Sequence, residues 1–267
     1  MACIPMWIDT HCHLDAAEFG TDPGFVAEVA GHAGVSRIVI PAIARDNFSR
    51  VRDLARMHAN CAYALGIHPI FVPQAAEEDL EILREAIDAA MSDPRFVAVG
   101  EIGLDFFVPG LGEGELREKQ EFFYSEQLKI ARDAGLPVLL HVRRSQDIIL
   151  KYLRRIDVPG GIAHAFNGSF QQAEEFIRLG FKLGFGGAMT FPRALQIRRL
   201  ASSVDEDALV LETDAPDISP VWLHPRRNSP EELPRIGQVL AELRGLPVER
   251  VAELTASNAR SVLARLN

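Results

Sequence analysis

Short apolar segments alternate with helix-like stretches along almost all of the 267 residues, and this alternation restricts the fold more than any other feature of the chain. The apolar segments, which are predicted to be strands, cover residues 6–10, 36–42, 61–67, 96–102, 137–142, 161–166, 181–186 and 208–213. Helical patterns separate them, so the strands are expected to lie parallel in one α/β sheet. Eight such units close most naturally into a TIM (β/α)₈ barrel, and a doubly wound open sheet is the alternative.

The stretch 116–134 is typical of the predicted helices. Its apolar face is formed by Leu116, Phe122, Phe123, Leu128, Ile130 and Ala131. Gly135 is expected to end this helix, and Ser169 and Asp46 are expected to cap the N-termini of two others. Residues 231–244 and 249–266 predict two extra C-terminal helices that cover the outside of the barrel. No linker, charge block or repeat divides the chain, so residues 1–267 are predicted to form a single domain.

Composition excludes several classes of protein. Hydrophobic residues make up 48% and charged residues 24%, which is typical of a globular protein and not of a disordered one. No apolar run approaches the ~18 residues that span a bilayer, and residues 1–10 lack the pattern of a secretory signal. We therefore expect a cytoplasmic protein without a membrane partner, and no stable protein partner is evident. Three cysteines without CxxC spacing disfavour disulfides and thiolate zinc sites.

The charge balance bears on nucleic-acid binding. With 28 Lys and Arg against 37 Asp and Glu, the formal net charge is −9. A protein that grips many phosphates by counterion release would carry the opposite sign, so a tight nonspecific duplex binder is disfavoured. An enzyme that meets phosphate in one pocket stays possible, because bound divalent cations reverse the local field.

Residues that commonly bind metals stand at the ends of the predicted strands. His11 and His13 follow the first strand and, being two residues apart, are expected to project together while Cys12 faces away. The fourth, fifth, sixth and eighth strands end at Glu101, His141, His164 and Asp214. Any one of these could be a solvated strand end. Barrel enzymes build their sites at these ends, so six coincidences favour a site.

Histidine and carboxylate ligands without cysteine suit Zn²⁺, Mg²⁺ or Mn²⁺. Six candidate ligands exceed what one tetrahedral ion needs, so two divalent metal cations are the expected cofactors, with Glu101 bridging them. Paired ions roughly 3.5–4 Å apart polarise phosphoryl or acyl oxygens and activate water. Asp214 would then serve as both ligand and proton acceptor, which makes Asp214 and Glu101 the catalytic candidates. Metal affinity is expected to fall below about pH 6 as histidines titrate.

Some neighbouring residues have two interpretations each. His68 either contacts a substrate phosphate or is a structural histidine hydrogen-bonded beside Pro69. Arg143 is either a phosphate clamp or a surface arginine; with His68 it completes the candidate substrate-binding residues. Asp105 either orients a metal ligand or caps a loop. Phe107, with its neighbour Phe106, either stacks a base or packs against the barrel rim.

Six motifs carry a family resemblance: DTHCHLD at 9–15, GIHP at 66–69, GEIGLD at 100–105, LHVRR at 140–144, HAFNGS at 164–169 and ETDAPD at 212–217. In order and spacing they resemble the TatD family of metal-dependent deoxyribonucleases. The resemblance implies an amidohydrolase-like barrel that hydrolyses phosphodiester bonds of DNA, at ends or in short single strands. It also implies one ion on His11, His13 and Asp214, a second on His141 and His164, and Glu101 between them. Many relatives have histidine and serine where this chain has Ile70 and Asn167.

Two other functions compete with the nuclease. The first is a small-molecule amide or ester hydrolase of the amidohydrolase superfamily, which the same metal pair would allow. Such enzymes often bridge their ions with a carbamylated lysine, whereas the fourth strand here offers Glu101. The second is a noncatalytic binding protein, against which the presence of all six candidate ligands argues.

Overall fold

The computed structural model describes residues 6–266, and in it eight strands form one sheet whose order follows the sequence from β1 to β8. The strands are β1 (Trp7–Asp9), β2 (Val35–Pro41), β3 (Cys61–Leu65), β4 (Phe96–Asp105), β5 (Val138–Arg143), β6 (Gly161–Ala163), β7 (Phe181–Phe185) and β8 (Leu209–Leu211). Neighbouring strands pair in parallel. Thr10 N donates to Leu211 O at 3.1 Å, which joins the two edges, so the barrel is confirmed and the open sheet is not.

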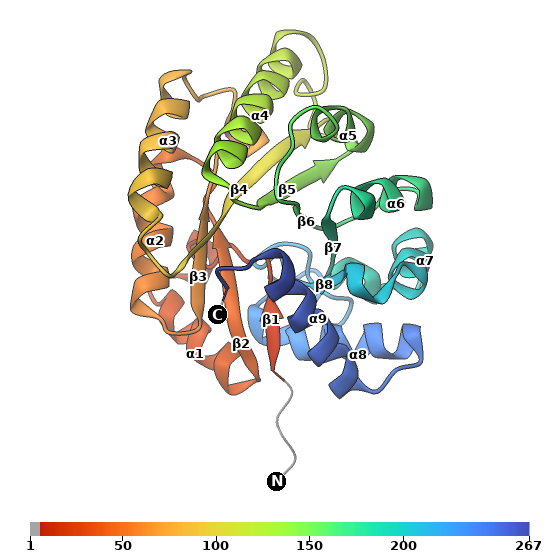
Figure 1. Ribbon diagram of the computed structural model, residues 1–267. Helices are drawn as coiled ribbons and strands as arrows, with labels where there is room; N and C mark the ends of the chain where they lie inside the picture. Colours follow the sequence, from red (N-terminus) through yellow and green to blue (C-terminus); the bar gives the residue numbers. More distant parts are fainter. Residues whose placement is uncertain (1–5, 267) are drawn as a thin grey trace.

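Helices surround the strands (Figure 1). They are α1 (Pro23–His32), α2 (Phe48–Met57), α3 (Glu78–Ala90), α4 (Gly114–Ala134), α5 (Gln146–Leu153), α6 (Phe170–Arg178), α7 (Leu195–Ser203), α8 (Leu233–Arg244) and α9 (Val248–Val262). Single turns of 3₁₀ helix are η1 (Ala17–Phe19), η2 (Arg45–Asn47), η3 (Pro69–Phe71), η4 (Gly187–Thr190), η5 (Glu206–Ala208) and η6 (Pro230–Glu232). Most of the core lies between the strands and these outer helices.

Two of the three predicted helix ends are confirmed. Gly135 ends α4 in the left-handed conformation, with φ of 65°. Ser169 caps α6 by accepting a hydrogen bond from Gln172 N, and the Gln172 side chain accepts one from Ser169 N. The prediction for Asp46 is wrong, because Asp46 lies inside η2 and Asn47 is the residue that precedes α2.

The two C-terminal helices differ in what they cover. α8 packs outside the barrel as expected, and at Gly237 the ring of Trp7 approaches so closely that a Cβ would lie 2.4 Å from it. The prediction is wrong for α9, which covers the end of the barrel where the strands begin. Its apolar residues cluster with inward-facing Ile8, Leu139 and Val210, and Figure 1 shows it in front of β1 and β8.

Hydrogen bonds fix α9 to the starts of strands on both sides of the barrel. Asn258 donates to Leu209 O, where β8 begins. Arg265 donates from Nε to Phe96 O, where β4 begins, at 2.7 Å. The helix and the residues after it therefore close the bottom of the barrel, and the opposite end is left open for a site.

Two further expectations concern membranes and cysteines. Among residues 6–266 we find no helix with the length and apolarity that a bilayer crossing requires. Cys12 and Cys61 are free and buried, and Cys3 lies outside the described residues. Cys12 belongs to the core behind the site, as its position in the first motif predicts.

Candidate metal centre

The six predicted ligands meet at the open end of the barrel, although some lie further from the strands than expected. His11 and His13 follow β1, His141 lies in β5, His164 is the first residue after β6, and Asp214 lies three residues after β8. Glu101 was expected to end its strand, but β4 continues to Asp105. The register between β4 and β5 shifts after Val99, and such a bulge re-aims the Glu101 side chain.

Glu101 lies at the centre of the cluster, and its first carboxylate oxygen faces the histidines that follow β1. Oε2 lies 3.0 Å from His11 Nε2 and 3.3 Å from His13 Nε2. These two nitrogens are 3.3 Å apart, so the predicted pair does project together. Asp214 Oδ1 completes this side at 3.6 Å from His11 Nε2 and 3.7 Å from His13 Nε2.

The second oxygen of Glu101 faces the histidines from β5, β6 and the loop after β3. Oε1 lies 2.9 Å from His164 Nε2 and 3.0 Å from His141 Nδ1. His68 Nε2 also reaches it, at 3.4 Å. One carboxylate thus has a separate group of nitrogens on each oxygen, which is the arrangement that bridging two ions requires.

His68 combines parts of its two interpretations. Its Nδ1 accepts a hydrogen bond from Ile70 N at 3.1 Å, which is a structural contact beside Pro69. Its Nε2 points the other way, to His141 Nδ1 at 3.0 Å. The ring therefore belongs to the cluster as well as to the loop, and a contact with substrate stays a prediction.

The chemistry of this donor set fits divalent cations. His68 Nε2 and His164 Nε2 both lie within 3.3 Å of His141 Nδ1, and a ring nitrogen carries either one hydrogen or one lone pair, so hydrogens cannot satisfy all these contacts. Three combinations of residues place their donor atoms within 4.8 Å of one another: His11 with His164 and Asp214, His11 with His13 and Glu101, and His68 with Glu101 and His141. Converging nitrogen and oxygen lone pairs are what Zn²⁺, Mn²⁺ and Mg²⁺ bind.

Burial and the neighbouring charges shift the pKa values of the ionisable groups in this cluster in different directions. Burial alone would raise the pKa of Glu101, but the imidazoles around it hold that pKa well below its usual range. Burial lowers the pKa of His11 to about 3 and that of His68 to about 4. Burial would lower the pKa of His13 too, yet Glu101, Asp214 and Asp15 raise it to about 9. These shifts favour the neutral imidazole at His11 and His68 and the protonated one at His13.

Carboxylates behind the cluster orient its histidines. Asp105 Oδ2 lies 2.9 Å from His141 Nε2, while its Oδ1 accepts the backbone N–H groups of Phe107 and Val108. Asp105 therefore makes the contacts of both interpretations, while metal binding by His141 stays a prediction. Because these bonds and the imidazole outweigh burial, the pKa of Asp105 falls to about 2.

Sequence reasoning assigned no role to two other buried carboxylates. Asp9 accepts hydrogen bonds from Thr213 Oγ1 at 2.6 Å and from Thr213 N, which ties β1 to the end of β8. Glu212 lies 3.7 Å from His164 Nδ1. The available signal was parity: Asp9 and Glu212 each precede a predicted ligand by two residues, so each points to the same face.

The cluster opens into a cavity of about 1320 Å³ at the mouth of the barrel. Arg143 lines it, with its side chain about half exposed. Ile70 and Asn167, the two departures from the family pattern, line it as well. The departures therefore lie where they would contact a substrate and not among the predicted ligands.

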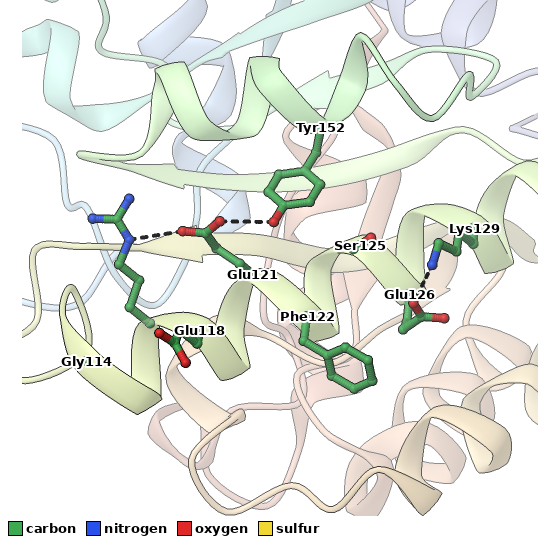
Figure 2. Close-up of a pocket in the computed structure, with 9 residues that line it drawn as sticks. Gly114, Glu118, Glu121, Phe122, Ser125, Glu126, Lys129 and Tyr152 are labelled. Carbon is green, nitrogen blue, oxygen red and sulfur yellow. Dashed lines mark hydrogen bonds and ion pairs between the residues drawn. The ribbon is translucent and has the colours of Figure 1, made fainter.

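A second cavity, of about 640 Å³, lies along α4 and shares no lining residue with the first. Figure 2 shows the Glu121 carboxylate facing Tyr152, and Glu121 accepts hydrogen bonds from Arg117 and Tyr152. Leu116 and Phe122 were expected on the apolar face of α4, but they are 37% and 40% exposed, so the prediction is wrong for these two. It is confirmed for the buried residues Phe123, Leu128, Ile130 and Ala131.

Comparison with known proteins agrees with this geometry. A family model described as TatD related DNase matches residues 8–264. The chain belongs to the TatD family. TatD homologs include the uncharacterized metal-dependent hydrolase YjjV of Escherichia coli (strain K12), which is 40% identical over 94% of this chain and 95% of its own. Its crystal structure matches at 38% identity with a TM-score of 0.91, covering 98% of this chain and 99% of that one.

Two further proteins resemble this TatD family chain, one informative about activity and one about the fold alone. The 3'-5' ssDNA/RNA exonuclease TatD of Erwinia amylovora is 32% identical over 95% of this chain and 98% of its own. An uncharacterized amidohydrolase from Saccharomyces cerevisiae is 17% identical, with a TM-score of 0.80 over 96% of this chain and 99% of that one, and shares the fold. The predicted amidohydrolase-like barrel is thus confirmed, and the chain is a metal-dependent hydrolase of the TatD family.

Proposed function

We propose that this hydrolase is a deoxyribonuclease that cleaves phosphodiester bonds at the ends of DNA or in short single strands. The observation that carries the proposal is the divided environment of Glu101, with the nitrogens of His11 and His13 on one oxygen and those of His141 and His164 on the other. Two cations bridged in this way suit hydrolysis at phosphorus. The exonuclease name of the Erwinia relative supports the same substrate class.

In this proposal His11, His13 and Asp214 would hold the first ion, His141 and His164 would hold the second, and Glu101 would contribute to both. Such ions, when bound, withdraw charge from a phosphoryl oxygen and from an attacking water. The protein's part is to hold the ligands in place. Asp105 fixes the ring of His141 through its Nε2, so that Nδ1 faces the centre.

Asp214 is the proposed proton acceptor. Burial raises its pKa to about 6 despite the opposing imidazoles. A carboxylate within reach of the attacking water can accept its proton. Its backbone is held by the bond from Asp214 N to His11 O at 2.8 Å, and its φ is 55°. The side chain lines the cavity, where it can meet a substrate.

Arg143 and His68 are the proposed contacts to substrate phosphate. Both line the cavity beside the cluster, and neither has a carboxylate closer than 3.4 Å among residues 6–266. A guanidinium offers paired N–H donors that match phosphate oxygens. Among the described residues, no lysine lines this cavity. The carbamylated lysine that often bridges the ions of small-molecule amidohydrolases therefore has no counterpart there.

The test is an activity panel with Mg²⁺, Mn²⁺ or Zn²⁺ on end-labelled single-stranded DNA, duplex DNA and RNA, beside simple esters and amides. We expect cleavage of DNA and two bound ions per chain by elemental analysis. Faster turnover of an ester or amide than of any nucleic acid would replace the nuclease with the small-molecule hydrolase. Full activity with a single ion at saturating metal would remove the two-metal mechanism.

A matched pair of variants shows whether the activity belongs to this site. Asp214→Asn removes the proposed proton acceptor and should lower turnover by on the order of a thousandfold or more. Asp217→Asn makes the same change at an exposed carboxylate of the same loop and should leave turnover within about twofold. Equal losses in the two variants would argue against the role of Asp214.

A further inference from the structure

Two arginines rest on one aromatic ring at the rim of the mouth cavity. The guanidinium carbon of Arg143 lies 3.9 Å from the centre of the Phe107 ring, and that of Arg144 lies 4.6 Å from it. Phe107 is 45% exposed, and all three residues line the cavity. A guanidinium held against a ring keeps its N–H donors available to a ligand.

The two guanidiniums carry charge that the protein does not neutralise. Across residues 6–266 no carboxylate lies within 4.0 Å of Arg144, and Arg143 approaches Asp105 at 3.9 Å. Asp105 already bonds His141 and two backbone N–H groups. In a chain of net charge −9, two adjacent cations without a carboxylate of their own favour an anionic ligand.

The backbone also directs Arg144 to this place. Its φ is 56°, in the left-handed region that residues with a Cβ rarely adopt. Both neighbours are fixed: Arg143 pairs with Asp105 in the β4–β5 ladder, and Ser145 Oγ donates to Leu104 O at 2.7 Å. The surrounding structure thus imposes the turn, and strain of this kind is concentrated at ligand sites.

The opposite rim of the cavity has the other charge. Asp15 and Glu18 follow β1 and Asp217 follows β8, and all three line the same cavity. Phe107 follows β4, and the two arginines lie at the end of β5. In the closed order β1 to β8, strands β4 and β5 stand across the barrel from β8 and β1. A polyanion at the centre is therefore attracted to one rim and repelled by the other.

We infer that Arg143, Arg144 and Phe107 form a binding site for a second phosphate group of the substrate, the one next to the bond being cleaved. The inference rests on the proposed function. The site lies close enough for a neighbouring phosphate, because Arg143 approaches the same carboxylate that bonds His141. Arg144 and Phe107 are positioning residues, since they would hold the DNA strand of the substrate and do not touch the reacting atoms.

The experiment compares three dinucleotides: TpT, which has one phosphodiester, and pTpT and TpTp, which add a phosphate on either side. We expect one of the two extended substrates to show a kcat/KM about tenfold higher than TpT. Arg144→Asn should abolish that gain and leave TpT unchanged, because asparagine tolerates the left-handed backbone and only the charge is lost. Phe107→Leu should reduce the gain in part.

Arg226→Asn is the matched control, because Arg226 is an exposed arginine in a cavity of about 710 Å³ that adjoins the acidic rim. It should keep the full gain. Equal kcat/KM for all three dinucleotides, or loss of the gain in Arg226→Asn but not in Arg144→Asn, would overturn the inference and leave the nuclease proposal standing. Failure of wild-type protein to cleave any of them with any metal would overturn both.

Discussion

The two ends of the barrel are built from the same eight strands, yet they contain opposite kinds of side chain. At the closed end, Leu139 and Val210 pack on α9, and hydrogen bonds from Asn258 and Arg265 bind the starts of strands. At the open end, ionisable side chains crowd around the buried carboxylate of Glu101, and its partners leave buried polar atoms without hydrogen bonds.

This difference assigns stability to one end and chemistry to the other. Burying apolar surface at the closed end favours folding by about 25 cal/mol per Å². Burying charges and unpaired polar atoms at the open end costs free energy. His11 Nδ1 and His164 Nδ1 are such atoms among the described residues. A division of this kind predicts that the two ends respond differently to mutation.

The largest expected effect comes from Glu101→Gln, which keeps the volume of the side chain and removes the charge that both groups of histidines share. Affinity for both ions should fall together, and turnover should fall by at least about a thousandfold. His141→Ala should mainly weaken one ion. Isothermal titration with Mn²⁺, paired with rate measurements, checks this. Loss of a single ion in each variant, independently and to the same degree, would contradict the bridging role.

At the closed end we expect the reverse result from Leu263→Ala. This fully buried leucine packs among the inward-facing residues of the strands, so its truncation should lower the free energy of unfolding by roughly 2–5 kcal/mol. Metal content and kcat of the folded protein should not change. Urea denaturation gives the stability, and Leu195→Ala, at a position that is 70% exposed, is the control with a change below about 0.5 kcal/mol. A loss of metal binding in Leu263→Ala would break the division between the two ends.

The pH dependence of metal affinity sharpens the comparison. An ion must displace protons from His13, whose pKa is raised to about 9, and from His164, whose pKa Glu101 raises well above its usual range despite burial, so affinity should rise with pH through the neutral range. The expected slope is about tenfold per pH unit for each proton displaced. From the sequence alone, metal affinity is expected to fall only below about pH 6. Calorimetry in buffers of different ionisation enthalpy counts the released protons, and affinity that is constant above pH 7 would refute the shifted value.

Most of this architecture could be predicted from local pattern. The eight strands and the approach of His11 and His13 follow from side-chain periodicity, which is a short-range property. The role of α9 could not be predicted, because its helical pattern does not say whether Ala259 and Leu263 meet the outside of the barrel or its end. That choice depends on contacts with residues far earlier in the chain, such as Ile8 and Val210.

The same limit applies to the site. Glu101 and His141 could be predicted as partners because each ends an apolar segment of the sequence, although β4 and β5 both continue beyond them. Glu212 and Arg144 are harder to assign. Parity places Glu212 on the face of Asp214 but does not show that it lies 3.7 Å from His164 Nδ1, and Arg144 rests on a ring that belongs to another loop. A residue that acts by orienting another group is harder to recognise in a sequence than a residue that ends an apolar segment.

The smallest expected effect concerns the two rims of the open end. With a net charge of −9, binding should depend on the cations and a few groups such as Arg143, so log affinity should fall with log salt at a slope of about −1 to −3. Arg143→Ala should make that slope shallower by somewhat less than one, weaken all sequences alike and leave metal content unchanged. Arg226→Ala, beside the acidic rim, should leave the slope as it is. Fluorescence anisotropy of labelled single strands across a salt series measures this. A steep slope that Arg143→Ala does not alter would mean that DNA binds to a basic surface outside the mouth cavity. The charge difference between the two rims would then not explain how DNA is held.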